Sequence, residues 1–124
     1  MANSYVTNLY PKPTAGVGDR QLTCSSTAGD FFGKQANGSA GGTTVDGNSD
    51  AFNKLTRYVV IDVQVADARV TYDGTASGGQ PTASRGHILY AGRSYTWSKQ
   101  AAEKAFVIND GSTNAVLHVS EFTD

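Results

Sequence analysis

The second half of the chain, from Leu55 to Phe122, is the feature that most limits what this sequence can fold into. It consists of short runs in which apolar and polar residues alternate, separated by turn sequences such as Asp73-Gly74 and Ala91-Gly92. Alternation with a period of two places every second side chain on one face of a strand, and turns at spacings of roughly 8–12 residues favour a sandwich or barrel. The sequence therefore predicts an all-β fold: a single β-sandwich or small barrel with one short helix and an extended N-terminal arm.

Two strands and a helix are predicted from local patterns in this half. Apolar residues from Leu55 to Val65 fall mainly at odd positions, which indicates a half-buried strand. A second strand is predicted over residues 68–72 by the same alternation. Ser98 has the residue type of an N-cap, so we expect a helix of under two turns over residues 99–105. A helix of that length needs to pack on a sheet in order to persist.

Two hairpins are also expected in this half. Residues 86–90 and 93–97 flank Ala91-Gly92, and a two-residue connection containing glycine suits a tight hairpin. Residues 106–108 and 114–122 flank an Asn-Asp-Gly-Ser turn and predict a second one.

The first half gives a weaker pattern. We expect one domain overall, in which residues 1–54 form an N-terminal arm and a Gly-rich loop region, packed on or extending from a β-sandwich core over residues 55–124. Residues 21–26 are predicted to be a strand. Residues 28–50 are rich in Gly, Ser, Thr and Asn, which predicts a long loop, and loops of that length are usually functional or mobile.

The arm is predicted from two prolines. Pro11 and Pro13 cannot both lie in a central strand, because each lacks the N–H that a strand ladder needs. The apolar segment Tyr5–Tyr10 before them is therefore expected to be an extended arm or an edge strand.

Aromatic residues are the candidate partner-binding residues. Phe31 and Phe32 are the large apolar residues of the predicted loop, and two interpretations remain open: they pin the loop to its own domain, or they anchor it to a neighbouring subunit. Aromatic anchors carry much of the binding energy at interfaces. We predict partner contacts for Tyr5, Tyr10, Phe31, Phe32 and Trp97, although Trp97 also fits a core position.

Composition and charge argue against several classes of function. The chain has 10 basic and 11 acidic residues, so no basic excess is available for nucleic acid. No apolar stretch approaches the roughly 20 residues that cross a membrane, and no polybasic segment favours a membrane surface. The first four residues lack the features of a secretion signal, so we expect synthesis in the cytoplasm.

Groups that could perform catalysis are sparse. Cys24 is the one cysteine and fits a small buried residue. His87 and His118 each fall inside a predicted strand, without the spacing of a zinc site. The Asp46–Asp50 segment starts like a calcium loop, but Ala51 stands where that loop needs glycine. We therefore expect no catalytic residues, no metal, no cofactor and no enzymatic activity.

The segment 62–74, with Val70-Thr71-Tyr72-Asp73-Gly74 at its end, resembles a group of small virion proteins of tailed bacteriophages. The resemblance continues through residues 81–92, which include Pro81-Thr82 and Gly86-His87, and it closes with residues 115–122. It covers roughly residues 58–122. An insertion before Pro81 departs from the pattern, and residues 1–50 show no comparable likeness.

This resemblance implies a structural part of a phage particle. Among such parts, capsid decoration (cement) proteins are similar in size, β content and charge; they commonly form homotrimers on the capsid surface and clamp neighbouring subunits of the major capsid protein. The expected partners are thus the major capsid protein and further copies of the chain. The alternatives are a receptor- or carbohydrate-binding module of a tail fibre or head spike, suggested by Tyr58, Tyr90, Tyr95 and Trp97, or a neck or tail component. A small hydrolase or lyase is the least favoured.

Overall fold

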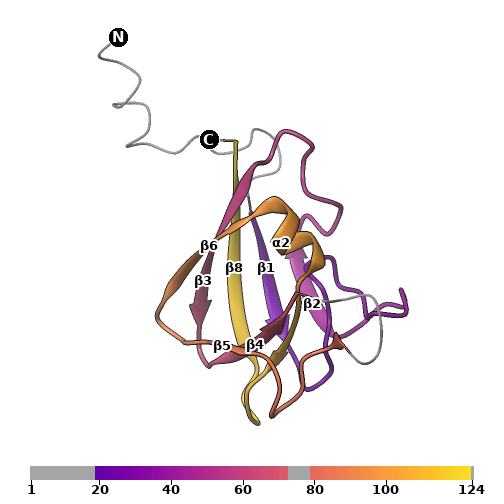
Figure 1. Cartoon of the computed structure of the whole chain (residues 1–124), viewed down its shortest axis with the longest axis vertical. Helices are drawn as coiled ribbons and strands as arrows, with labels where there is room; N and C mark the ends of the chain where they lie inside the picture. Colours follow the sequence, from indigo (N-terminus) through magenta and orange to yellow (C-terminus); the bar gives the residue numbers. More distant parts are fainter. Residues whose placement is uncertain (1–18, 73–78, 124) are drawn as a thin grey trace.

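The computed structural model describes residues 19–72 and 79–123, and these form two antiparallel β-sheets with one short helix (Figure 1). This confirms the predicted all-β fold of the sandwich or small-barrel type. The predicted arm, with Tyr5 and Tyr10, lies outside the described residues, as does the Asp73-Gly74 turn.

The larger sheet has five strands, and the smaller has three. In spatial order, the five strands are β2 (Thr43–Gly47), β1 (Asp19–Cys24), β8 (Ala115–Phe122), β3 (Tyr58–Gln64) and β6 (Ser94–Ser98). The three strands are β5 (His87–Leu89), β4 (Ala68–Thr71) and β7 (Phe106–Asn109). The larger sheet thus takes strands from both sides of residue 55, because β1 and β2 pair into it.

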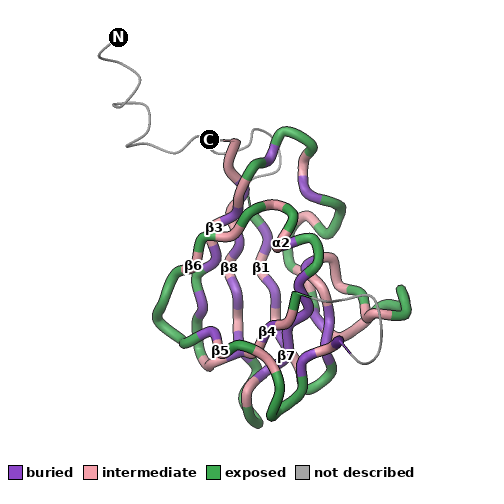
Figure 2. The backbone as a smooth tube through the Cα atoms, in the orientation of Figure 1, coloured by how far each residue is buried: buried purple, intermediate pink, exposed green. Residues whose placement is uncertain are grey.

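The core lies between the two sheets, and the alternation of the strands places it there. Val59, Ile61 and Val63 of β3 are buried, while the residues between them are more exposed (Figure 2). Val70 of β4 and Val107 of β7 are fully buried in the same cluster. Each fully buried side chain of this size stabilises the fold by about 1.5–3 kcal/mol.

Helix α2 (Lys99–Lys104) follows β6 directly and confirms the predicted helix and its cap. The Ser98 hydroxyl accepts a hydrogen bond from the Ala101 N–H at 3.2 Å. Ala102 is fully buried in the core cluster, so the helix packs on the sheet as its short length requires.

Both predicted hairpins are wrong, although their strands exist. β5 pairs with β4 and β6 pairs with β3, so the Ala91-Gly92 connection crosses from one sheet to the other. The turn bonds to β3: the Gly92 N–H donates to the Val63 carbonyl at 2.8 Å. In the same way, β7 pairs with β4, whereas β8 pairs with β1 and β3. Turn sequences reveal where the chain reverses but not which strand it then joins.

Strand β3 is shorter than its predicted span. Leu55 is 66% exposed, and a backbone hydrogen bond from the Thr56 N–H to the Asn53 carbonyl makes a turn before the strand. At the other end, Val65 is 72% exposed and has φ +74°, a conformation that β-branched residues rarely adopt. Apolar side chains at both ends therefore extended the alternating pattern beyond the strand itself.

The predicted loop over residues 28–50 contains a strand that sequence patterns missed. β2 pairs with β1, with Val45 opposite Leu22. Glycines just before it permit a close crossing of two chain segments: a Cβ on Gly29 would lie 2.4 Å from the Thr43 nitrogen and 2.7 Å from the Gly42 carbonyl carbon. The many glycines of this region predicted a loop, but two of them instead allow tight packing of the backbone.

Candidate partner-binding surface

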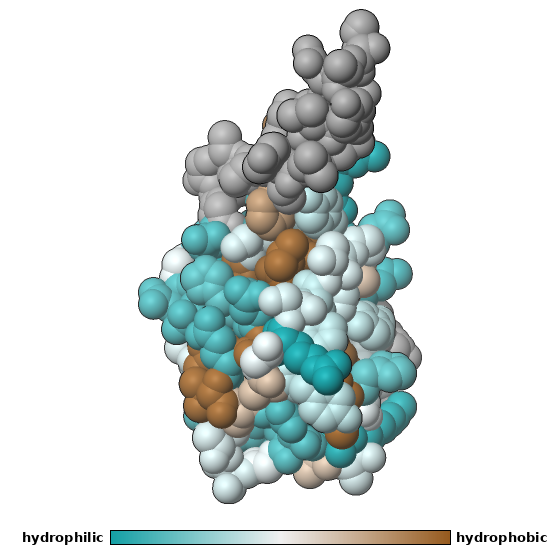
Figure 3. Space-filling view, turned by 90° about the vertical axis from the view of Figure 1, so that its left-hand side faces the viewer, coloured by the Kyte–Doolittle hydropathy of each residue, from teal (hydrophilic) through white to brown (hydrophobic). Residues whose placement is uncertain are grey.

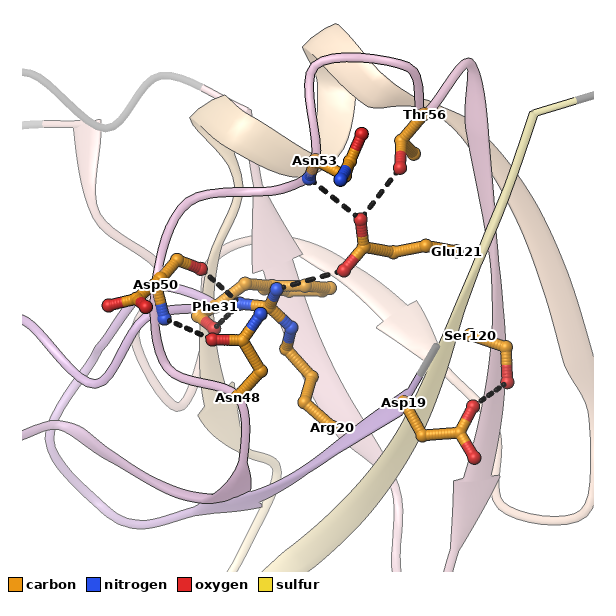
Figure 4. Close-up of polar contacts among 9 residues, drawn as sticks. All are labelled: Asp19, Arg20, Phe31, Asn48, Asp50, Asn53, Thr56, Ser120 and Glu121. Atoms are coloured by element: carbon orange, nitrogen blue, oxygen red, sulfur yellow. Dashed lines mark hydrogen bonds and ion pairs between the residues drawn. The ribbon is translucent and has the colours of Figure 1, made fainter. Parts of the chain in front are cut away.

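A buried ion pair joins the neighbouring strands β1 and β8 on the inner face of the larger sheet (Figure 4). Arg20 of β1 and Glu121 of β8 lie 3.0 Å apart, and each side chain is only 1% exposed. Sequence analysis did not single out either residue. The available signal was position, because Arg20 alternates with the buried Leu22 and Cys24.

The ion pair also holds the segment that runs from residue 31 to residue 56. Nη1 of Arg20 donates to the carbonyl oxygens of Phe31 at 3.1 Å and Asp50 at 2.9 Å. Oε1 of Glu121 accepts the Asn53 N–H at 3.0 Å and the Thr56 hydroxyl at 2.7 Å. These charged groups are therefore engaged in holding the structure together rather than presented to a ligand.

Phe31 and Phe32 belong to this packed region. Phe31 is fully buried, with its ring centroid 5.8 Å from that of Trp97 and 6.4 Å from that of Phe52. Phe32 is partly buried, and the Arg20 guanidinium lies over its ring at 5.2 Å and over the ring of Phe52 at 4.6 Å. In this conformation the Phe31 side chain is not accessible to a partner, which agrees with the interpretation that it pins the loop to its own domain.

Trp97 is partly buried and packs against the core rather than standing free on the surface. Its ring meets Tyr72 edge to face with centroids 5.3 Å apart. Trp97 and Tyr95 share the inner face of the larger sheet, since they lie opposite Val59 and Ile61. Tyr58 lies on the outer face and stacks on Phe122. The aromatic residues that suggested a sugar-binding platform therefore do not share one face.

Cys24 is buried, whereas the two histidines lie at the surface. Burial raises the pKa of the Cys24 thiol to about 12, so the thiol is un-ionised at neutral pH. His87 is exposed, and Nε2 of His118 lies 3.6 Å from Oδ2 of Asp19 on the open surface. Within residues 19–72 and 79–123, no three His, Cys, Asp or Glu side chains gather as metal ligands. None of the helices in that part of the chain has the length and apolar character to span a membrane.

The outer face of the larger sheet is not covered by any other element of the described residues. The smaller sheet and α2 contribute to the core on the inner side, and no described helix or strand lies over the outer one. The outward side chains follow from the strand register: Thr44, Asp46, Asp19, Gln21, Thr23, Val116, His118, Ser120, Phe122, Tyr58, Val60, Asp62, Gln64, Ser94, Thr96 and Ser98.

This surface, which we call the outer face, is acidic and rich in hydroxyl groups. It holds Asp19, Asp46 and Asp62 but no Lys or Arg. Two of the aspartates are held by hydroxyl donors, Asp19 by Ser120 at 3.0 Å and Asp62 by Ser94.

Comparison with known proteins adds no family: the chain matches no protein-family profile, no curated protein and no solved structure.

Proposed function

We propose that this chain is a capsid decoration protein of a tailed bacteriophage, binding neighbouring subunits of the major capsid protein on the particle surface through apolar and β-edge contacts. The observation that carries the proposal is the uncovered outer face, whose apolar residues include Tyr58, Val60, Val116 and Phe122, together with the open edge of β2 in the described residues. Open strand edges offer unpaired backbone N–H and C=O groups to another chain.

The use of the buried charged groups supports a binding role over a catalytic one. The buried Arg20 and Glu121 bond to each other and to the backbone of the segment they hold. A catalytic acid or base needs a cleft and a free proton-transfer atom near substrate. Both carboxylate oxygens of Glu121 instead accept hydrogen bonds from within the protein.

The attribution to a phage particle rests on the sequence resemblance. Two of its glycines occupy turn positions that need them: Gly86 has φ +122° and Gly92 has φ +85°. A Cβ on Gly86 would also lie 3.0 Å from the Val70 carbonyl oxygen, within the same resembling stretch. These glycines of the resembling stretch serve turns, so the resemblance bears on the fold. The capsid partner is the part of the proposal that needs a binding test.

The test is to add the purified protein to expanded shells of the phage capsid and to measure bound protein by sedimentation and electron microscopy. We expect regular density on the shell surface. Val60→Lys places a long cation at the middle of the outer face, and we expect it to weaken binding by about tenfold or more, the equivalent of about 1.4 kcal/mol.

Ser112→Lys is the matched control, because Ser112 is exposed in the turn between β7 and β8, away from the outer face. Shells that carry no density at saturating protein would rule out the decoration role. Equal binding by both lysine variants would instead remove the outer face as the contact surface.

A further inference from the structure

Strand β6 ends the larger sheet, and its register shows which backbone groups are unused. The Lys99 N–H donates to the Arg57 carbonyl at 3.0 Å, and the Val63 N–H donates to the Arg93 carbonyl at 3.0 Å. Hydrogen-bonding direction alternates along an antiparallel strand, so the odd residues of β6 bond to β3. The backbone N–H and C=O groups of Ser94 and Thr96 therefore point to the open edge.

This edge lacks the features by which proteins usually protect an exposed strand. β6 has the sequence Ser-Tyr-Thr-Trp-Ser, without a proline or a charged residue, and no other described strand pairs with its free side. Natural edge strands commonly carry Lys, Pro or a bulge, which prevent pairing with another chain. Seen from the side on which β6 lies, the surface is mostly weakly polar or hydrophilic, with separate hydrophobic patches (Figure 3). Recognition at this edge would rely on backbone hydrogen bonds.

We propose that the segment Tyr5–Tyr10 of a second copy of this chain pairs with the open edge of β6 and extends the larger sheet by one strand. The segment reads Tyr-Val-Thr-Asn-Leu-Tyr, which is uncharged and rich in β-branched and aromatic residues. Its six residues are enough to span the five residues of β6. Pro11 follows at once and cannot donate to a ladder, so pairing ends there.

Strand direction favours a second copy over the same chain. Eighteen residues precede Asp19, and β1 is separated from β6 by β8 and β3, a lateral distance of about 14 Å at about 4.8 Å per strand. β1 starts at the end of the sheet toward which β6 runs, so the direct route would bring a chain's own segment alongside β6 in parallel. A second copy can pair antiparallel, which is slightly more stable.

The inference does not depend on the proposed function, because it concerns assembly of the purified chain alone. The experiment measures the mass of the full chain by light scattering and the exchange rates of the Ser94 and Thr96 amides. We expect a mass of at least two chains and slow exchange at both amides. Thr96→Pro removes an N–H that β3 does not use and should raise the dissociation constant about tenfold, the effect of one or two lost hydrogen bonds.

Two further variants keep the test decisive if Thr96→Pro impairs folding. Val6→Pro/Thr7→Pro removes a donor from the segment in either pairing register and should weaken association to a similar extent. Thr96→Ala and Thr14→Pro/Ala15→Pro are the controls and should leave the oligomer intact. A monomeric wild-type chain, with its two β6 amides exchanging quickly or slowly, would overturn the proposal. An oligomer that survives both proline changes would overturn it equally.

Discussion

Two neighbouring pairs of residues on β1 and β8 show how differently one sheet uses its two faces. On the inner face, Arg20 and Glu121 form an ion pair whose side chains are 1% exposed (Figure 4). One residue away in each strand, Asp19 and Ser120 form a hydrogen bond on the outer face, where Asp19 is 64% exposed. Both pairs join a polar residue of β1 to one of β8, but their surroundings differ.

The difference lies in what each pair can hold in place. Water screens the outer pair, so it contributes at most about 1 kcal/mol. The inner pair gives up hydration, and Nε of Arg20 finds no hydrogen-bond partner among the described residues, so an apolar replacement could match the pair in stability. Its contribution is positional, since it binds the backbone at Phe31, Asp50 and Asn53. The inner face thus fixes the Gly-rich segment, whereas no described helix or strand covers the outer face.

The strongest test of this difference between the two faces is Glu121→Ala, which leaves the Arg20 charge buried and without its ion-pair partner. We expect a loss of about 3–5 kcal/mol in the free energy of unfolding, measured by urea denaturation. Ser120→Ala, one residue away on the outer face, should change that free energy by less than about 0.5 kcal/mol. Equal losses of stability in the two variants would contradict the conclusion that the inner ion pair holds the structure in place and the outer hydrogen bond does not.

A double variant separates charge burial from packing. Arg20→Met/Glu121→Leu removes both charges together and should be less destabilising than Glu121→Ala alone. Limited proteolysis within residues 48–56 should nevertheless increase, because the hydrogen bonds that hold this segment are gone. If the double variant were the less stable one, the ion pair would be a net source of stability.

The next largest effect is expected where the Gly-rich segment crosses itself. Gly29→Ala should cost about 1–3 kcal/mol, because its Cβ would meet backbone atoms at 2.4–2.8 Å that cannot move aside. Gly111→Ala is the control, since a Cβ there meets nothing within 4 Å. Thermal unfolding of both variants measures the difference. Similar midpoints would mean that this segment is not tightly packed.

Cys24 extends the comparison to alkaline pH. Its pKa rises from 9.0 to about 12 on burial, so the unfolded chain releases the thiol proton first as pH increases. The resulting stability is complete below pH 9 and is lost between pH 9 and about 12, at up to about 1.4 kcal/mol per pH unit. Cys24→Ala should unfold with a shallower pH dependence over this range. An unchanged dependence would refute the burial of the thiol.

The smallest effect is expected for Asp19→Asn on the outer face. It weakens the exposed contacts to Ser120 and His118, and the free energy of unfolding should change by less than about 0.5 kcal/mol. Any change should shrink further at high salt, because exposed charges are screened. A larger loss, measured by urea denaturation in low salt, would show that the outer face contributes to folding.

Strand content could be predicted from the sequence, because alternation marks β3 and β4 directly. Pairing partners could not, since Ala91-Gly92 has the residues of a hairpin turn yet bonds to Val63 of β3. β2 was missed because Gly and Asn around it mark a loop, whereas close crossings need glycine too. The sequence also could not show how far Phe31 and Trp97 are buried. Their burial depends on the tertiary partners Phe52 and Tyr72.

The order of strands in the larger sheet also has a consequence for how the chain is made. β1 is synthesised early, but its central partner β8 ends at Phe122. At about 5–20 residues per second, the ribosome needs roughly 5–20 s to supply that partner. During this interval β1 can pair with β2 but not with β8. The larger sheet can therefore close only after β8 has been made, and we expect incomplete chains to be prone to aggregate.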